Sequence, residues 1–133
     1  MSQKQVFQAP DVVIQVNLTH DRLEVVWKDV IDEESLANAH SILKAIIQEH
    51  GLKKYYGNVV NALLTLELEH QMEQKKTDLN LIYQAGIRYF AMHARSQEQI
   101  ELRKPLMDMM TPDDAKIFWT TDEQAAKAWL DRY

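Results

Sequence analysis

The chain has 133 residues, of which 46% are hydrophobic and 26% charged, the composition of one ordinary globular domain. Its 20 acidic and 15 basic residues give a net charge of −5, which excludes the basic footprint of a nucleic-acid-binding protein. It contains no cysteine, so disulfides, thiolate catalysis and cysteine-based zinc sites are excluded. With no signal peptide and no membrane span in the sequence, we expect a cytoplasmic protein.

The N-terminal part of the sequence predicts a hairpin. Residues 1–10 are polar and end in Pro10, and we expect a flexible N-terminal arm there, followed by one domain over residues 11–133. Apolar residues alternate with polar ones over 12–18 and again over 23–27, which is the period of a half-buried strand. Two short strands joined by a polar turn predict an antiparallel hairpin.

A helix and a third strand follow the hairpin. Asp32 is the expected N-cap of a helix over residues 33–50, and Gly51 is placed to end it. Apolar residues recur within this range at helical spacing. Residues 53–60 are rich in tyrosine and valine and predict a strand.

The stretch from Leu63 to Leu68 fits two patterns. Its leucines alternate with polar residues, which indicates a strand, but the same leucines continue into an apolar helical face that ends at Gly86. We favour a helix from about Thr65 to Ala85, because Glu, Gln, Lys, Met and Leu dominate this range.

Residues 87–94 are apolar at consecutive positions, as in a strand that is covered on both faces. Ser96 and Gln99 form a capping-box pattern at the start of a helix that continues to Met110. Pro105 lies inside this pattern and should kink the helix or split it in two.

The last two elements are a short strand over 116–119 and a helix that ends at Tyr133, with Thr121 and Gln124 as its capping box. The predicted order is β-β-α-β-α-β-α-β-α. Strands that alternate with helices imply parallel neighbours, so we predict an α/β domain with a mixed five-stranded sheet and about four helices.

Four features carry a resemblance to a known family. They are the hairpin ending at Trp27 with its Asp32-Glu33-Glu34 helix start, the strand after Gly51, the junction Gln84-Ala85-Gly86-Ile87-Arg88-Tyr89-Phe90-Ala91, and the closing segment from Ile117 to Leu130. The order of elements resembles the SpoIIAA-like fold of STAS domains, and it is most similar to the small bacterial proteins termed STAS/SEC14-like.

This resemblance implies a non-enzymatic role in bacterial regulation, through binding of a protein partner or a small ligand. In one branch of the STAS family a serine or threonine after the middle strand is phosphorylated, inside an Asp-Ser-x-Gly-like turn. Here residues 58–65 contain neither serine nor glycine, and only Thr65 carries a hydroxyl group. The chain therefore departs from the family at its phosphate-accepting turn, while the fold remains a separate question.

The carboxyl ends of parallel strands are where open α/β sheets bind ligands. The polar residues expected there form a possible ligand or partner surface and are Asn58, Asn61, Thr65, His93, Arg95, Ser96 and Thr121. Helix N-termini near three of them, together with Arg95, would suit an anion. The commoner alternative is that Ser96 and Thr121 only cap helices and that Arg95 is solvated.

Catalytic and metal-binding patterns are weak. Glu67 and His70 form a single Glu-x-x-His, whereas a di-iron site needs two of these and further carboxylates. The sequence has no glycine-rich phosphate loop and no nucleophile elbow, so we predict no catalytic residues, no metal and no cofactor.

Three functional hypotheses remain, in this order. The first is a non-enzymatic regulatory or interaction module that forms a homodimer and binds a protein partner. The second is a carrier or sensor of a small apolar or anionic ligand, with an enclosed cavity under residues 97–115. The third is an enzyme.

Overall fold

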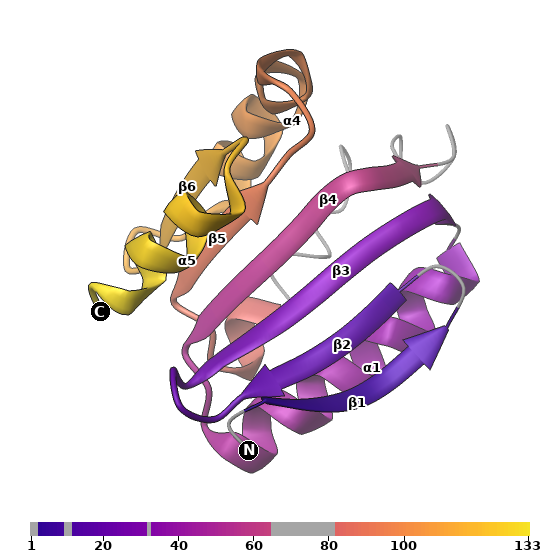
Figure 1. Ribbon diagram of the computed structural model, residues 1–133, viewed down its shortest axis with the longest axis vertical. Helices are drawn as coiled ribbons and strands as arrows, with labels where there is room; N and C mark the ends of the chain where they lie inside the picture. The colour runs from indigo at the N-terminus through magenta and orange to yellow at the C-terminus, as the bar shows by residue number, and fades with distance from the viewer. Residues whose placement is uncertain (1–2, 10–11, 32, 65–81) are drawn as a thin grey trace.

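The computed structural model describes residues 3–9, 12–31, 33–64 and 82–133, and these form a six-stranded sheet with helices on both faces (Figure 1). The strands lie side by side in chain order: β1 (Gln3–Ala9), β2 (Val12–Asn17), β3 (Arg22–Ile31), β4 (Lys54–Leu64), β5 (Tyr89–His93) and β6 (Lys116–Thr120). The first three are antiparallel, and β3 to β6 are parallel. The helices among these described residues include α1 (Glu33–His50), α4 (Gln97–Met110) and α5 (Glu123–Asp131).

The predicted mixed sheet is confirmed, and all five predicted strands are present. A sixth strand, β1, pairs with β2 along the edge of the sheet. Residues 3–9 therefore belong to the sheet, which corrects the expectation of a flexible arm over this part of residues 1–10. An edge strand is held by main-chain hydrogen bonds along one side, so it needs no alternating apolar pattern, and its polar sequence concealed it.

The end of α1 agrees with the prediction. Gly51 has a positive φ of 62°, and the Leu52 N–H donates to the Ile47 carbonyl at 3.1 Å, which closes the last turn as expected of a glycine-ended helix. The predicted N-cap, Asp32, lies outside the described residues.

The ambiguous stretch is a strand as far as Leu64, because β4 continues four residues beyond the predicted end at Val60. The predicted helix over 65–85 lies outside the described residues up to 81, and residues 82–85 form a helical turn before Gly86.

Two helix details differ from the prediction. Residues Gln97–Met110 form one continuous α4 with Pro105 inside it, so the helix is not split. The N-cap of α5 is Asp122, not Thr121, and its carboxylate accepts a hydrogen bond from the Gln124 N–H at 3.0 Å. A carboxylate also suits the positive end of the helix dipole, which a hydroxyl does not do.

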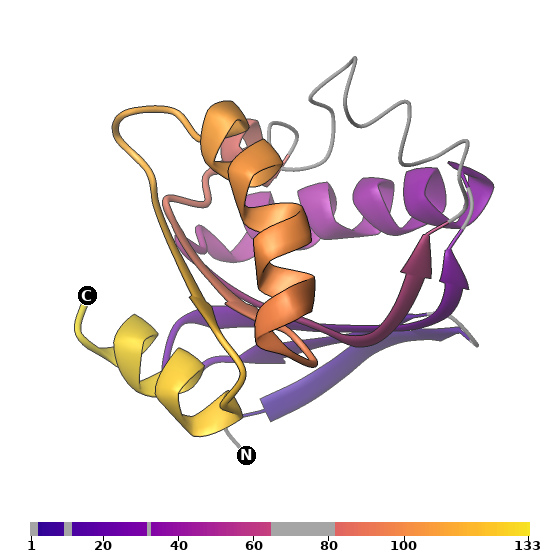
Figure 2. The same ribbon diagram turned by 90° about the horizontal axis from the view of Figure 1, so that it is seen from above.

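The helices are divided unequally between the two faces of the sheet. Figure 2 shows α1 and α4 on one side of the sheet and α5 on the other. Right-handed crossover connections that all lead to the next strand in the same direction place their helices on one face of the sheet. Helix α5 follows the last strand, so it connects no two strands and can fold onto the other face. We call the two sides the α1 face and the α5 face.

Alternation along the strands builds a different layer on each face. On the α1 face, Leu23, Val25 and Trp27 of β3 join the large core cluster. On the α5 face the core is much smaller and is made of Tyr56, Ala91, Ala126 and Leu130. The residues between the apolar positions of β3 therefore point toward α5, and they include buried charges.

Candidate functional site

A row of half-buried side chains crosses the α5 face of the sheet at the level where β5 and β6 end. Each residue of the row is paired in register with the next one, on adjacent strands from β2 to β6. They share the face of Tyr56 and Ala91, because Asn58 lies two residues after Tyr56 in β4 and His93 lies two residues after Ala91 in β5. We call this row the strip; its members are Val13, Val26, Asn58, His93 and Thr120.

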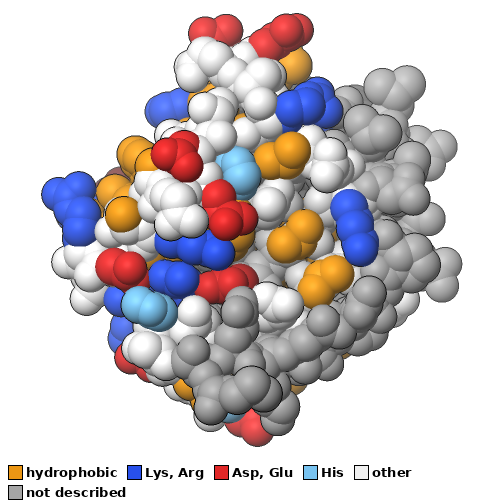
Figure 3. Space-filling model, in the orientation of Figure 1, with side chains coloured by type: hydrophobic (Ala, Val, Ile, Leu, Met, Phe, Trp, Pro, Cys, Tyr) orange, Lys and Arg blue, Asp and Glu red, His pale blue; other side chains and the backbone are white. Residues whose placement is uncertain are grey.

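Helix α5 covers only part of this face. It packs on β4, β5 and β6 and reaches the start of β3 through Arg22 and Glu24. No described helix lies over β2 or the rest of β3 on the side that faces the viewer in Figure 1. Figure 3 shows apolar, basic, acidic and histidine side chains together on this exposed face. The strip therefore begins beside the N-terminus of α5 and continues over open sheet.

A buried ion pair lies under α5. Arg22 Nε donates to Glu24 Oε2 at 2.7 Å, and both side chains are less than a tenth exposed. The Asn17 amide donates to the same carboxylate oxygen at 3.4 Å. Such a pair is stable in a low-dielectric site only when further hydrogen bonds satisfy the carboxylate, and Asn17 supplies one of them.

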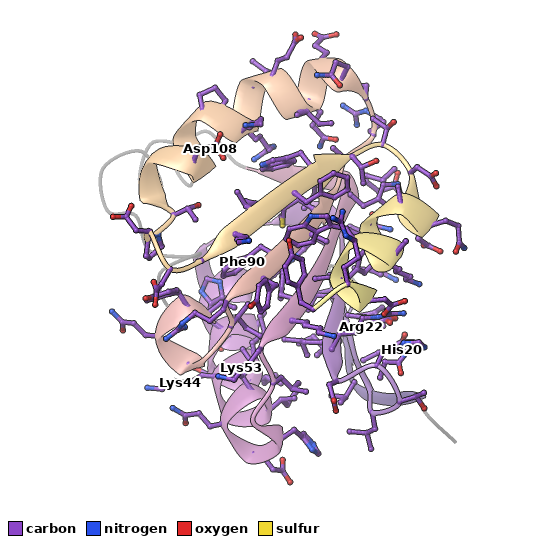
Figure 4. All side chains as sticks on the ribbon, turned by 90° about the vertical axis from the view of Figure 1, so that its left-hand side faces the viewer. His20, Arg22, Lys44, Lys53, Phe90 and Asp108 are labelled. Carbon is purple, nitrogen blue, oxygen red and sulfur yellow. The ribbon has the colours of Figure 1, made fainter. Side chains whose placement is uncertain are left out.

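The ion pair is connected to α5 and to the β2–β3 turn. Arg22 Nη1 lies 3.0 Å from Asp131 Oδ1, and His20 Nδ1 lies 3.1 Å from the same oxygen. At the other end of the pair, Lys127 Nζ lies 4.0 Å from Glu24 Oε1. Figure 4 shows His20 and Arg22 on the side of the sheet where α5 lies. The network therefore fixes α5 to β3.

A second chain of hydrogen bonds links the strip to α5. The Tyr56 hydroxyl lies 2.9 Å from His93 Nδ1 and 3.3 Å from Glu123 Oε1. A phenol has one proton to donate, so both contacts are satisfied when His93 Nδ1–H donates to Tyr56 and Tyr56 donates to the Glu123 carboxylate. This arrangement leaves Nε2 as the His93 nitrogen that does not contact Tyr56.

The environment of Tyr56 keeps its hydroxyl group protonated. Burial raises the pKa of Tyr56 well above its usual value, and the charge and hydrogen bond of Glu123 raise it further. Lys127 lies 5.1 Å from the centre of the Tyr56 ring and 3.6 Å from Glu123 Oε2. Tyr56 therefore donates to Glu123 and accepts from His93, which fixes the orientation of the His93 ring.

At the carboxyl end of β5, side chains replace a missing strand. β4 continues beyond the end of β5, so the next carbonyl groups of β4 need other donors. Gln99 Nε2 donates to the Val59 carbonyl at 3.0 Å, and Arg95 Nη1 lies 3.5 Å from the Val60 carbonyl. The Gln99 side chain also accepts from the Arg95 N–H at 2.5 Å.

The structure brings together some of the predicted surface residues. Asn58 and His93 are direct neighbours in register, and Asn61 is exposed beside Lys28. Asn58 also accepts from the Val60 N–H at 3.0 Å, at the register shift between β3 and β4.

The remaining predicted residues have different positions. Ser96 caps α4, accepting from the Gln99 N–H at 3.2 Å. Thr121 is exposed outside the α5 cap, and Thr65 lies outside the described residues. Arg95 contacts backbone at the end of β4.

Sequence reasoning missed the polar network between α5 and the sheet, which is made of Arg22, Glu24, Tyr56, Glu123 and Lys127. One signal was available, because charged residues alternate with Leu23 and Val25 in a strand from the middle of the sheet. The pairing of β4 with the last helix had no local signal, since Tyr56 and Glu123 are separated by 67 residues.

Two further properties bear on function. Among the residues that the structure describes, no group of three or more His, Cys, Asp or Glu side chains is placed to hold a metal ion. None of the described helices combines the length and apolar character needed to cross a membrane.

Comparisons with known proteins identify the architecture. No protein-family model matches the sequence, and neither does any curated protein. Among solved structures, the chain is similar to an uncharacterized protein of the DUF3478 family from Shewanella loihica PV-4, described as having a SpoIIAA-like fold. The match has a TM-score of 0.67 at 14% sequence identity and covers 96% of this chain and 99% of the other. The chain therefore has the SpoIIAA-like fold that its order of elements resembles.

Proposed function

We propose that the protein is a non-catalytic interaction module that binds a protein partner on the strip. The observation that supports this most directly is the composition of the strip, in which the half-buried Val13 and Val26 lie beside the half-buried Asn58 and His93. No described helix covers the two valines. A contiguous apolar patch bordered by polar groups is typical of a protein-binding surface.

The buried groups next to the strip support a binding role over a catalytic one. Glu24 is shared between Arg22 and Lys127, and Tyr56 is held protonated as a donor. These groups stabilise the position of α5 and of His93, as expected of a surface that is preorganised for recognition. A suitable partner would present an apolar side chain to the valines and a hydrogen-bond donor to His93 Nε2.

The alternative, a carrier of an anionic ligand, has less support. Its strand-end site depends on Arg95, whose guanidinium group is already directed at the Val60 carbonyl. The side chain of Gln99, in the first turn of α4, is fully used by β4 and by the Arg95 backbone. The interaction module is therefore the hypothesis that we favour.

A site-specific photo-crosslinker tests the proposal. A benzophenone amino acid at position 26 is compared with one at position 128, because Ala128 is exposed on α5 and lies away from the strip. We expect a discrete protein adduct from position 26 only.

The partner identified in this way is then purified and its affinity measured by calorimetry. Val26→Lys should weaken binding about tenfold or more, which is 1.4 kcal/mol, whereas Ala128→Lys should leave it unchanged. Equal adducts from both positions, or equal affinities of both variants, would contradict the proposal. Circular dichroism of each variant confirms that it is folded.

A further inference from the structure

The two edges of the sheet differ in how open they are to pairing. An edge strand presents unpaired backbone groups that can add another strand, and many proteins block such edges with bulges, prolines or charges. β1 has a register shift between Gln5 and Phe7. β6 pairs with β5 without a shift, and its only charged residue is Lys116 at its start.

Hydrogen bonds show which residues of β6 face outward. The Lys116 N–H donates to the Arg88 carbonyl at 2.8 Å, and the Thr120 carbonyl accepts from the Ala94 N–H at 2.9 Å. Because strand residues alternate in direction, Ile117 and Trp119 direct their N–H and C=O groups away from β5. Figure 4 views the molecule from this side and shows no described element over the outer edge of β6, which runs between α4 and α5.

Aromatic side chains lie along this edge on the α5 face. Phe118 stacks on Trp129 with ring centres 5.4 Å apart, and Trp129 contacts Tyr133 edge-on at 5.1 Å. Tyr133 in turn stacks on Tyr89 at 4.3 Å. Phe118 and Trp129 remain partly exposed, and aromatic residues of this kind are enriched at the centres of protein interfaces.

We propose that β6 pairs antiparallel with β6 of a second copy of this chain, with the two-fold axis at Phe118. In this register Ile117 lies opposite Trp119 of the second copy, and the two residues exchange both backbone hydrogen bonds. The two Phe118 residues form the closely spaced pair at the axis. The contact is isologous, so two copies complete it and no β6 edge is left for a third.

Charge at the two ends of β6 favours a second copy over an unrelated extended peptide. β6 begins at Lys116, and the cap residue Asp122 follows its end. Antiparallel pairing about Phe118 places Lys116 opposite Thr120 of the second copy and therefore near Asp122 of that copy. Opposite charges at both ends support this register and disfavour a parallel one.

Disulfide trapping tests the register directly, because the natural chain has no cysteine. Phe118→Cys places two thiols at the axis, where the Cα separation of about 4.5 Å allows a disulfide. Thr120→Cys is the matched control on the same face, since the two copies of residue 120 would be about 13 Å apart. We expect Phe118→Cys to form covalent dimer at least about tenfold faster than Thr120→Cys under mild oxidation.

Light scattering on the unmodified chain supplies the second measurement. We expect a mass of twice the 15.6 kDa of one chain at high micromolar concentration. Ile117→Pro removes an outward N–H that β5 does not use and should give a folded monomer, whereas Ile117→Thr keeps this N–H and should remain dimeric. A monomeric natural chain, or equal trapping at positions 118 and 120, would overturn the proposal even if Ile117→Pro did not fold.

Discussion

Replacing Glu24 by Gln should destabilise the fold more than any surface charge change. The substitution removes the negative charge that faces the buried guanidinium of Arg22 at 2.7 Å, while the shape of the side chain is kept. Breaking a buried ion pair from one side costs about 3–5 kcal/mol, and Gln retains some hydrogen bonding, so we expect about 3 kcal/mol. For a domain of this size that lowers Tm by about 10 °C.

Urea unfolding of a double-mutant cycle measures this effect. Glu24→Gln and Arg22→Met should each cost about 3 kcal/mol, whereas the double variant Arg22→Met/Glu24→Gln should cost less than the sum, because neither charge of the pair is left facing a neutral partner. The control is the exposed pair Lys104–Asp108, 2.6 Å apart on α4, where Lys104→Ala should cost less than about 0.5 kcal/mol. Additive effects at positions 22 and 24, or single costs no larger than the control, would refute this reasoning.

Three further outcomes follow from individual side chains. Trp27 Nε1 donates to the Tyr55 hydroxyl at 3.1 Å, whereas the buried Trp119 Nε1 has no partner among the described residues. In urea unfolding, Trp27→Phe should therefore cost about 2–3 kcal/mol and Trp119→Phe less than about 1 kcal/mol. Equal costs would contradict this. Burial raises the pKa of Tyr56 in the folded protein, so the stability that the protonated hydroxyl contributes is complete below pH 10 and is lost as the pH rises further. Tyr56→Phe should flatten the fall in unfolding free energy between pH 10 and 11. An unchanged slope would argue against this. Arg95→Ala should leave the thermal shift with phosphate, nucleotides and carboxylates unchanged, and loss of such a shift would restore the anion-site hypothesis.

The fold could be predicted where the sequence has a strong local period. The alternation over residues 12–18 and 23–27 is that of a sheet with one apolar core face, and Gly51 marks a positive-φ helix end. β1 could not be found in this way, because its pairing is made by backbone groups that every residue carries. Pro105 is the opposite case, because a proline is a strong local signal for the end of a helix, yet α4 continues past it from Gln97 to Met110.

Some neighbours among the candidate residues could be predicted, but not the groups that hold them. Asn58 and His93 are neighbours in register, as expected of adjacent parallel strands, although Asn58 lies within β4 rather than at its end. The groups that orient His93 could not be inferred, because Tyr56 meets Glu123 only after α5 folds back across the sheet. The prediction of Thr121 as the N-cap of α5 was wrong by one position. The Asp122 N–H donates to the Thr120 hydroxyl, and the Asp122 carboxylate caps the helix by accepting from the Gln124 N–H.

The three tryptophans of the chain lie in three different elements, β3, β6 and α5. Trp27 belongs to β3, whereas Trp119 and Trp129 lie along β6 and beside it. The indole emission of a Trp27→Phe variant would therefore come entirely from the outer edge of β6. Light emitted by the protein itself would then report, without an added label, whether that edge faces water or another chain.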